Sequence, residues 1–304
     1  MTIRRFACTQ CGKCCNRSPE VELSEAAALA DVFVFRLMFR LYWLPQQLGD
    51  YLAFGGESAE TGGAPAAAFY EKKRLLAAFA ARKSAVKVRR GGKAVAYTRY
   101  LSLSALALDT KPGACAALDG SRCSIYERRP VGCRSVPFHY SRAEALAEAG
   151  LDAFVATEGY RCDTSASAPV VLDGGKVLAP PFAAARAQAI ALAEQDRGWS
   201  DAIARRMSGG ALTLPSIAHV EANAQYGATT VSMRAAWQVA TDAGFIGQAE
   251  CDRLVALQLT QIGRALAAPG PSSERETLAE MREEYRRHGN KHIASPAPAV
   301  IIGA

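Results

Sequence analysis

The chain has 304 residues, of which 50% are hydrophobic and 21% charged, enough apolar material for one large domain or two modest ones. These proportions exclude a wholly disordered chain. The formal net charge of +7 permits an acidic partner, but Lys and Arg are spread along the chain without a block of five and without a nucleic-acid-binding motif. We therefore expect no nucleic-acid partner.

The N-terminal segment and the longest apolar run both favour a protein outside the membrane. MTIRRFACTQC has two arginines but no apolar stretch behind them, so it does not resemble a secretory signal. The run LADVFVFRLMFRLYWL contains Asp31, Arg36 and Arg40 and is too short and too charged to cross a bilayer. We expect no transmembrane segment and a cytoplasmic location. A helix lying on a membrane surface is the alternative interpretation of this run.

Apolar spacing and turn residues predict the elements in chain order. Ser24 is the expected N-cap of a helix that ends at Leu44, before Pro45. Residues 49–66 read as a loop and residues 69–83 as a helix. Gly-Gly pairs predict two β-hairpins, one around residues 91–92 and one around residues 174–175. Ala-rich amphipathic segments follow at 181–207, 216–226, 229–243, 247–267 and 273–288.

These elements predict an α+β fold that is predominantly helical, with short β-hairpins and a cysteine-rich metal-binding core. The expected organisation is a cysteine-cluster metal-binding domain at residues 1–180, with an insertion at about 45–85. A helical C-terminal region at residues 181–304 would pack on this domain. The oligomeric state does not follow from the sequence.

Eight of the nine cysteines fall into two groups of four. Thiolates are the preferred ligands of zinc and of iron–sulfur clusters, and a two-residue spacing lets one tight loop present two sulfurs to one centre. Cys251 stands apart in a helical segment, and we interpret it as a bystander. The eight candidate metal ligands are Cys8, Cys11, Cys14, Cys15, Cys115, Cys123, Cys133 and Cys162.

Cys14 and Cys15 are adjacent, which bears on the number of centres. Neighbouring side chains point in different directions, so both thiolates on one tetrahedral ion would strain the chain. In two-cluster ferredoxins the last cysteine of such a run serves the other cluster. Cys8, Cys11 and Cys14 are expected to share one centre completed from the second group, while Cys15 turns toward the remaining thiolates. Two centres and one polynuclear centre both stay open.

The metal is expected to be an iron–sulfur cluster, with zinc or mononuclear iron as alternatives. A tetrathiolate centre carries net negative charge and favours nearby cations. The motif supplies several arginines, and Arg134, directly after Cys133, is the one we expect to neutralise the site. His139 is a further possible ligand, although a histidine at such a position is more often only hydrogen-bonded or exposed. The arginines of the motif are Arg122, Arg128, Arg129, Arg134 and Arg161.

The cysteine pattern resembles a known family. The stretches CTQCGKCC and GACAALDGSRCSIYERRPVGCRSVPF, followed by a last cysteine, are similar to the YkgJ-type cysteine-cluster family, also called the CxxCxxCC or zinc- or iron-chelating domain family. The resemblance covers about residues 6–165 and implies the same eight cysteines as metal ligands. Cys251 has no counterpart in the motif. The flagellin lysine N-methylase has a similar cysteine pattern, which raises an enzymatic alternative.

The predicted function is a metal-binding protein with a redox or regulatory role, acting with an unidentified protein or redox partner. A metal-dependent enzyme such as a protein lysine N-methylase is the first alternative. Against it, the chain has no Gly-rich strand–turn–helix for a methyl donor or dinucleotide, and no C-x3-C-x2-C spacing. A metal-free thiol redox sensor is the second alternative.

Overall fold

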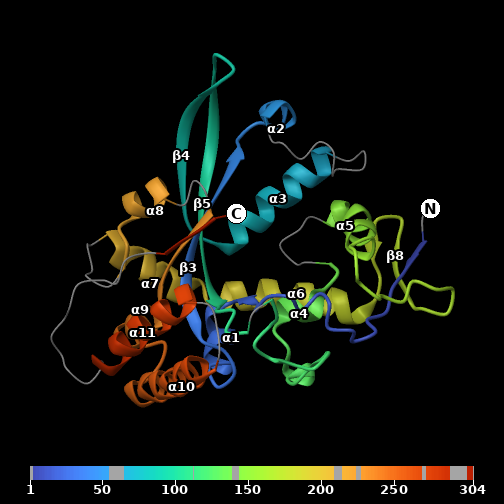
Figure 1. The fold of residues 1–304 in the computed structure, drawn as a ribbon. Coiled ribbons are helices and arrows are strands. Elements are labelled where there is room, and N and C mark those ends of the chain that lie inside the picture. Colours follow the sequence, from blue (N-terminus) through green and yellow to red (C-terminus); the bar gives the residue numbers. More distant parts are fainter. Residues whose placement is uncertain are drawn as a thin grey trace. The chain divides into compact units, whose positions relative to one another are not determined.

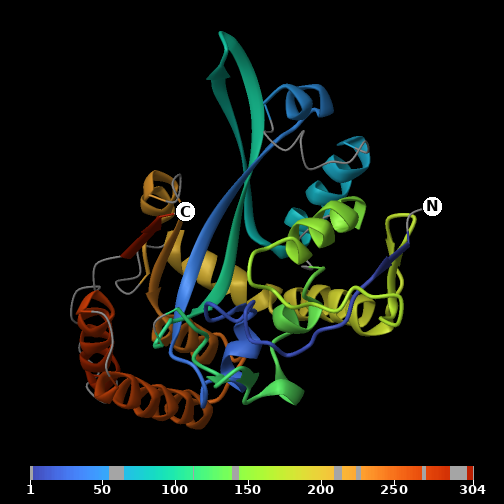
Figure 2. The same cartoon turned by 45° about the vertical axis from the view of Figure 1, so that its right-hand side comes forward.

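The computed structural model describes residues 3–54, 65–111, 113–138, 144–208, 214–223, 227–268, 272–287 and 300–303. Over these residues the chain forms helices and antiparallel strand pairs, and the helices hold more residues than the strands (Figures 1 and 2). The predicted α+β class is therefore confirmed at this level. No helix in the described ranges is long and apolar enough to cross a membrane.

Two compact units share the chain, and both are discontinuous in sequence. Unit 1 contains residues 1–14, 42–101 and 119–194. Unit 2 contains residues 15–41, 102–118 and 195–304. Neither unit coincides with the predicted regions 1–180 and 181–304, and that domain assignment stays a prediction. The boundary at residue 14 falls between the two adjacent cysteines.

A small sheet near the N-terminus organises one part of unit 1. Strand β1 (Ile3–Arg5) pairs antiparallel with β8 (Val170–Asp173), which pairs with β9 (Lys176–Val177). The predicted hairpin at 174–175 is confirmed, because Gly174 and Gly175 have φ of +54° and +81°, as a two-residue turn requires. The sheet packs on helix α5 (Ala147–Val155) and the turn η2 (Glu144–Leu146) that precedes it.

Strand β1 is fixed to helix α5 by charge as well as by apolar packing. Arg4 donates from Nε and Nη2 to the two carboxylate oxygens of Asp152, at 2.8 and 3.0 Å. Its Nη2 also lies 2.9 Å from Glu148. The bidentate geometry gives this partly exposed pair a defined direction, although such pairs contribute little stability on their own.

The rest of unit 1 contains a long hairpin and two helices. Strands β4 (Ala80–Arg90) and β5 (Lys93–Ala107) pair through the turn at Gly91 and Gly92, so the predicted hairpin is confirmed but is much longer than expected. Helices α2 (Leu48–Phe54) and α3 (Pro65–Phe79) occupy the predicted insertion. The loop predicted at 49–66 is wrong over α2, and residues 55–64 of it lie outside the described ranges.

Unit 2 is built on a sheet whose central strand was predicted as a helix. The strand order is β11 (Val300–Gly303), β10 (Gly227–Ser232), β3 (Phe35–Pro45), β5 and β2 (Glu20–Val21). Residues 35–39 of β3 are all buried. A strand buried on both faces reads as a continuous apolar run and imitates a core helix in sequence. The helix predicted over Ser24–Leu44 is therefore wrong beyond its first turns, and Pro45 ends a strand.

Only the short helix α1 (Leu23–Ala28) forms at the predicted start. Its N-cap is Glu22, which makes no side-chain cap hydrogen bond, and Ser24 lies inside the first turn. The capping acceptor comes from a distant segment of unit 2, because the carboxylate of Asp196 accepts from the Ser24 backbone N–H at 2.8 Å. The predicted Ser24 cap is thus replaced by a tertiary cap. Burial raises the pKa of Asp196, and the hydrogen bond from the Ser24 N–H opposes this rise because it favours the carboxylate.

The C-terminal segments form the predicted helices with two exceptions. The segment predicted at 181–207 forms two helices, which are separated at Asp196. Residues 229–232 of the segment predicted at 229–243 belong to strand β10, and Ser232, the last residue of β10, accepts from the Arg234 N–H and so caps α9. The described helices are α6 (Pro180–Gln195), α7 (Arg197–Ser208), α8 (Ile217–Asn223), α9 (Met233–Asp242), α10 (Gln248–Ala267) and α11 (Ser272–Arg286).

A buried glutamine joins α10 to the turn before β3 in unit 2. Gln258 is 0% exposed, and its amide nitrogen donates to the carbonyls of Ala30 and Phe33 at 3.1 and 2.7 Å. Its amide oxygen accepts from the Phe35 N–H at 2.8 Å. One side chain therefore satisfies three backbone groups that would otherwise be buried without partners.

We predict that Gln258→Leu destabilises the protein by about 3 kcal/mol, because three buried backbone groups lose their partners while the volume changes little. Urea unfolding followed by circular dichroism measures the free energy of unfolding. Gln248→Leu on the exposed start of the same helix is the matched control and should change it by less than about 0.5 kcal/mol. Equal losses in the two variants would contradict the role assigned to Gln258.

Candidate functional site

A short strand pairing in unit 1 brings the first cysteine run to the last cysteine. Ala7 and Asp163 exchange both backbone hydrogen bonds, at 2.8 and 3.1 Å, and Phe6 donates to the Pro169 carbonyl at 3.1 Å. Because the pairing is antiparallel, the next residues along it are Cys8 and Cys162, which stand opposite each other. Thr9 extends the connection, since its Oγ1 donates to the Arg161 carbonyl at 2.7 Å.

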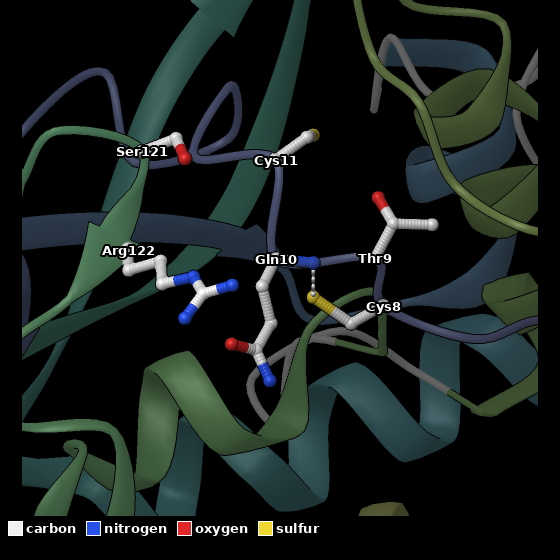
Figure 3. Close-up of a pocket in the computed structure, with 6 residues that line it drawn as sticks. All are labelled: Cys8, Thr9, Gln10, Cys11, Ser121 and Arg122. Carbon is white, nitrogen blue, oxygen red and sulfur yellow. Dashed lines mark hydrogen bonds between the residues drawn. The ribbon is translucent and has the colours of Figure 1, made fainter.

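The chain then turns sharply between the first two cysteines. Gln10 has a left-handed φ of +55°, which is uncommon for a residue with a side chain, and its N–H donates to the Cys8 Sγ at 3.4 Å. Figure 3 shows this bond as a dashed line, with Cys11 one residue further on. The turn gives the Cys8 sulfur a backbone donor, as is common where thiolates are held in a defined orientation.

Gly12 allows this loop to approach a second chain segment of unit 1. Its φ is +72°, and a Cβ at this position would lie 2.7 Å from the Ser121 carbonyl oxygen. Ser121 lies in the turn between β6 (Leu118–Asp119) and β7 (Arg122–Cys123). Glycine is therefore required both by the backbone conformation and by the space available.

Four thiols interact electrostatically in unit 1. Burial, followed by the charges of Cys11, Cys14 and Cys8, raises the pKa of Cys162 to about 11. The burial comes from an apolar cluster that includes Phe6, against which Cys162 packs. The titration of Cys162 is therefore coupled to that of three other thiols, as is expected of titratable groups in one region of a protein.

Cys11 differs from Cys162 in its surroundings. Backbone hydrogen bonds, from Lys13 first and from Arg161, lower the pKa of Cys11, against an opposing effect of burial and of the Cys14 charge. Hydrogen bonds to a sulfur favour its thiolate form. The loop therefore favours the thiolate form of Cys11, while the apolar cluster favours the protonated form of Cys162.

Cys15 and Cys115 lie together in unit 2. The Cys115 N–H donates to the Cys15 carbonyl at 2.9 Å, and β2, which follows Cys15, pairs with β5, which precedes Cys115. Ser18 donates its N–H to Asp109 and accepts from the Ala116 N–H at 3.3 Å, so the two segments stay side by side. Cys15 therefore belongs with the start of the second cysteine group, while the thiols of Cys8, Cys11 and Cys14 act on Cys162.

The other cysteines are placed by separate elements. In unit 1, half-buried Cys123 ends β7, and half-buried Cys133 lies in α4 (Val131–Ser135), which packs through Val131 on Ala185 and Ala189 of α6. Neither thiol is among those that raise the pKa of Cys162. Cys251 is buried inside α10 in unit 2, and its interpretation as a bystander stays a prediction.

The arginines of the motif have mixed roles. Arg134 donates from Nε to the Arg129 carbonyl at 3.0 Å. The Arg129 Cζ lies 3.7 Å from the ring centroid of Tyr126, the first residue of the turn η1 (Tyr126–Arg128). These contacts are structural and do not test the predicted neutralising role of Arg134. Arg122 instead extends toward the Cys8–Cys11 loop (Figure 3). His139 lies outside the described ranges.

A pocket of about 400 Å³ lies between this loop and the β6–β7 turn. Sequence reasoning missed three of the residues that line it, Thr9, Gln10 and Ser121. The signal available in the sequence was Gly12, because a glycine between closely spaced cysteines indicates a sharp turn or a close backbone approach. The segment that would approach it was not predictable. The lining residues are Cys8, Thr9, Gln10, Cys11, Ser121 and Arg122.

In the part of the chain that the structure describes, no three His, Cys, Asp or Glu side chains converge closely enough to hold a metal ion as they stand. Comparison of the sequence with protein-family models and with curated proteins, and of the fold with solved structures, gave no match. The function is therefore argued from the residues of this site.

We predict that Gly12→Ala destabilises the protein by roughly 2 kcal/mol or more, because the Cβ adds a clash with the Ser121 backbone to the strain of a left-handed φ. Gly159→Ala is the matched control, with φ of +80° and no atom within 4 Å of its Cβ. It should cost about 1 kcal/mol. Urea unfolding compares the two, and equal losses would contradict the close approach of Gly12 to Ser121.

In metal-free protein, alkylation of Cys11 and Cys162 should depend on pH in different ways. Only the thiolate reacts, so the Cys11 rate should level off below pH 9, the ordinary thiol value, because its pKa is lowered. The Cys162 rate should keep rising about tenfold per pH unit until about pH 11. Mass spectrometry of iodoacetamide-treated peptides measures both rates. A common plateau would contradict the different environments.

Proposed function

We propose that the protein binds an iron–sulfur cluster, with Cys8, Cys11, Cys14 and Cys162 as the ligands of one centre and with a redox or regulatory role. The observation that carries the proposal is the Ala7–Asp163 pairing, which sets Cys8 of the first cysteine run opposite Cys162. The raised pKa of Cys162, to which burial contributes first and the charges of the other three thiols next, agrees with it. Two of them, Cys8 and Cys14, are exposed, and the other two are half-buried. A set of purely structural cysteines would be buried and inert.

The donor set fits a thiophilic metal group. All four side chains are sulfur donors, which suit iron–sulfur clusters, zinc and copper(I) and not hard cations. Without a metal the thiolates repel one another, which is part of why the pKa of Cys162 is raised to about 11. A bound cationic centre would remove this repulsion and favour deprotonation of all four.

The sequence spacing of the donors favours a polynuclear group over a single ion. Cys8, Cys11 and Cys14 follow a C-x2-C-x2-C run, which is the ferredoxin pattern that a further cysteine completes. Structural zinc sites usually show paired CxxC sequences, and the second cysteine group has none. We therefore place the cluster first and a single zinc or iron ion second.

The surrounding residues of the chain would serve such a group in distinct ways. Phe6 and its apolar neighbours exclude water behind Cys162. The backbone N–H groups of Gln10 and Lys13 donate to Cys8 and Cys11, and hydrogen bonds to ligand sulfurs tune reduction potentials. The pocket leaves the Cys8–Cys11 side open, which suits electron exchange with a partner.

The other four cysteines stay ligand candidates because of their sequence pattern. The same pattern supports the further part of this proposal, that the chain is a member of the YkgJ-type cysteine-cluster family. The Cys15–Cys115 hydrogen bond in unit 2 supports the view that Cys15 serves a different set of thiolates from Cys14. The four residues concerned are Cys15, Cys115, Cys123 and Cys133.

The test is anaerobic purification followed by analysis of iron, acid-labile sulfide and zinc per chain, together with visible absorption. The wild-type protein should contain iron and sulfide and be coloured. Cys162→Ala should lose most of the metal of one centre, because a ligand is removed and the loss of one ligand lowers affinity steeply. Cys251→Ala, a buried cysteine outside the motif, is the matched control and should keep the wild-type content.

Three outcomes would contradict parts of the proposal. Colourless protein with stoichiometric zinc would exclude the cluster. Protein that binds no metal but forms reversible disulfides would favour the thiol redox sensor. If Cys15→Ala and Cys162→Ala lose identical metal and show identical spectra, the separate assignment of Cys14 and Cys15 would be wrong.

A further inference from the structure

The hairpin of unit 1 carries a concentration of basic residues. Residues 80–101 contain seven Lys or Arg residues and no Asp or Glu. Five of the seven lie on strand β4 alone. No more than two of the seven are adjacent in the sequence, so the sequence shows no basic block. The hairpin nevertheless places all seven along one short, continuous element. They are Arg82, Lys83, Lys87, Arg89, Arg90, Lys93 and Arg99.

Few of these charges are neutralised within the described chain. Lys93 pairs with Asp50 at 2.8 Å, and Arg99 donates to the Ser84 hydroxyl and lies over the Trp43 ring. Four others are exposed, and no carboxylate of the described residues forms an ion pair with them. The unneutralised residues are Lys83, Lys87, Arg89 and Arg90.

Strand β4 is also an edge of the sheet. Over the described ranges it pairs with β5 alone. Alternate residues Lys83, Lys87 and Arg89 are exposed on one face, while Val86 and Val88 are half-buried on the other. Figures 1 and 2 show β4 and the first half of β5 as a two-stranded ribbon ending in its turn. The outer side of β4 therefore presents backbone donors and acceptors beside a row of positive charges.

We propose that β4 is a docking strand for an extended acidic segment of a partner protein, which adds to the free edge and places its carboxylates beside Lys83, Lys87 and Arg89. Edge addition supplies main-chain hydrogen bonds, and alternate side chains supply specificity. Charges at a sheet edge also prevent aggregation, but one or two lysines achieve that, and β4 has five basic residues in eleven.

The composition of the ribbon favours a protein partner over a nucleic acid. Single-stranded nucleic acid is held by aromatic side chains that stack on bases, and β4 has none. Readers of base sequence use Asn and Gln for adenine beside Arg for guanine, and minor-groove binders frequently insert an apolar wedge between bases. The hairpin instead ends in Gly91 and Gly92, and β4 has neither Asn nor Gln. An acidic peptide strand needs only backbone donors and acceptors and a row of basic side chains, and the outer edge of β4 supplies both. The inference is independent of the metal.

The test uses fluorescence anisotropy with a labelled alternating Thr-Glu dodecapeptide and with an alternating Pro-Glu dodecapeptide of equal charge. Proline removes every second backbone donor and holds φ near −65°, away from the strand value of about −120 to −140°, so the Pro-Glu peptide keeps the charge but does not form a regular strand. The full-length protein should bind the Thr-Glu peptide more tightly than the Pro-Glu peptide. The combined variant Lys83→Glu, Lys87→Glu and Arg89→Glu should weaken this binding by about tenfold or more.

The matched control reverses three exposed basic residues elsewhere, through Lys176→Glu, Arg205→Glu and Arg264→Glu. It changes net charge equally and should keep the preference for the Thr-Glu peptide. Equal affinity for both peptides would overturn strand addition. Equal losses in the two triple variants would overturn the assignment to β4. Tighter binding of a single-stranded or duplex DNA oligonucleotide, lost in the β4 variant, would assign the surface to nucleic acid and overturn the proposal.

Discussion

The candidate site depends on one short antiparallel pairing in unit 1. The two hydrogen bonds between Ala7 and Asp163 set the position of Cys8 against Cys162, although the two cysteines are far apart in the chain. This pairing is an isolated bridge that follows the β1–β8 ladder along the N-terminal segment, and the Arg4–Asp152 ion pair and the packing of Phe6 fix that segment. A slip of one residue would turn every side chain to the opposite face, so the apolar anchor at Phe6 also fixes where the sulfurs lie.

The same pairing imposes an electrostatic cost on the thiols it assembles. It buries Cys162 against apolar side chains, and this burial, with the charges of three further thiols, raises the pKa of Cys162 to about 11. The Cys8–Cys14 loop is nevertheless pre-formed, because Gly12 packs on Ser121 and Gln10 donates to Cys8. A rigid loop that holds mutually repelling thiolates is stabilised by a ligand of opposite charge, which is how metal sites couple binding to folding.

Local chemistry in the sequence predicted some of this, and long-range pairing accounts for the rest. The pairs Gly91–Gly92 and Gly174–Gly175 predicted both hairpins, because glycine readily adopts the two successive positive φ angles that such a turn requires. The run ending at Leu44 was wrongly predicted as a helix because a strand buried on both faces has no alternation. The cysteine spacing gave the candidate ligands. Because Cys14 and Cys15 are adjacent in the sequence, they were predicted to serve different sets of thiolates. That Cys162 joins the first run depends on strand register, which spacing does not encode.

The cationic hairpin and the thiol group belong to the same unit but act independently. The groups that shift the pKa of Cys11 and Cys162 include sulfurs and backbone donors, and no residue of the 80–101 hairpin. Charges separated by more than about 8 Å are largely screened at physiological ionic strength. The ribbon therefore does not compensate the negative charge of the thiolates. Its unneutralised cations are available for a partner, so recruitment by β4 and chemistry at the cysteines can be changed separately by mutation.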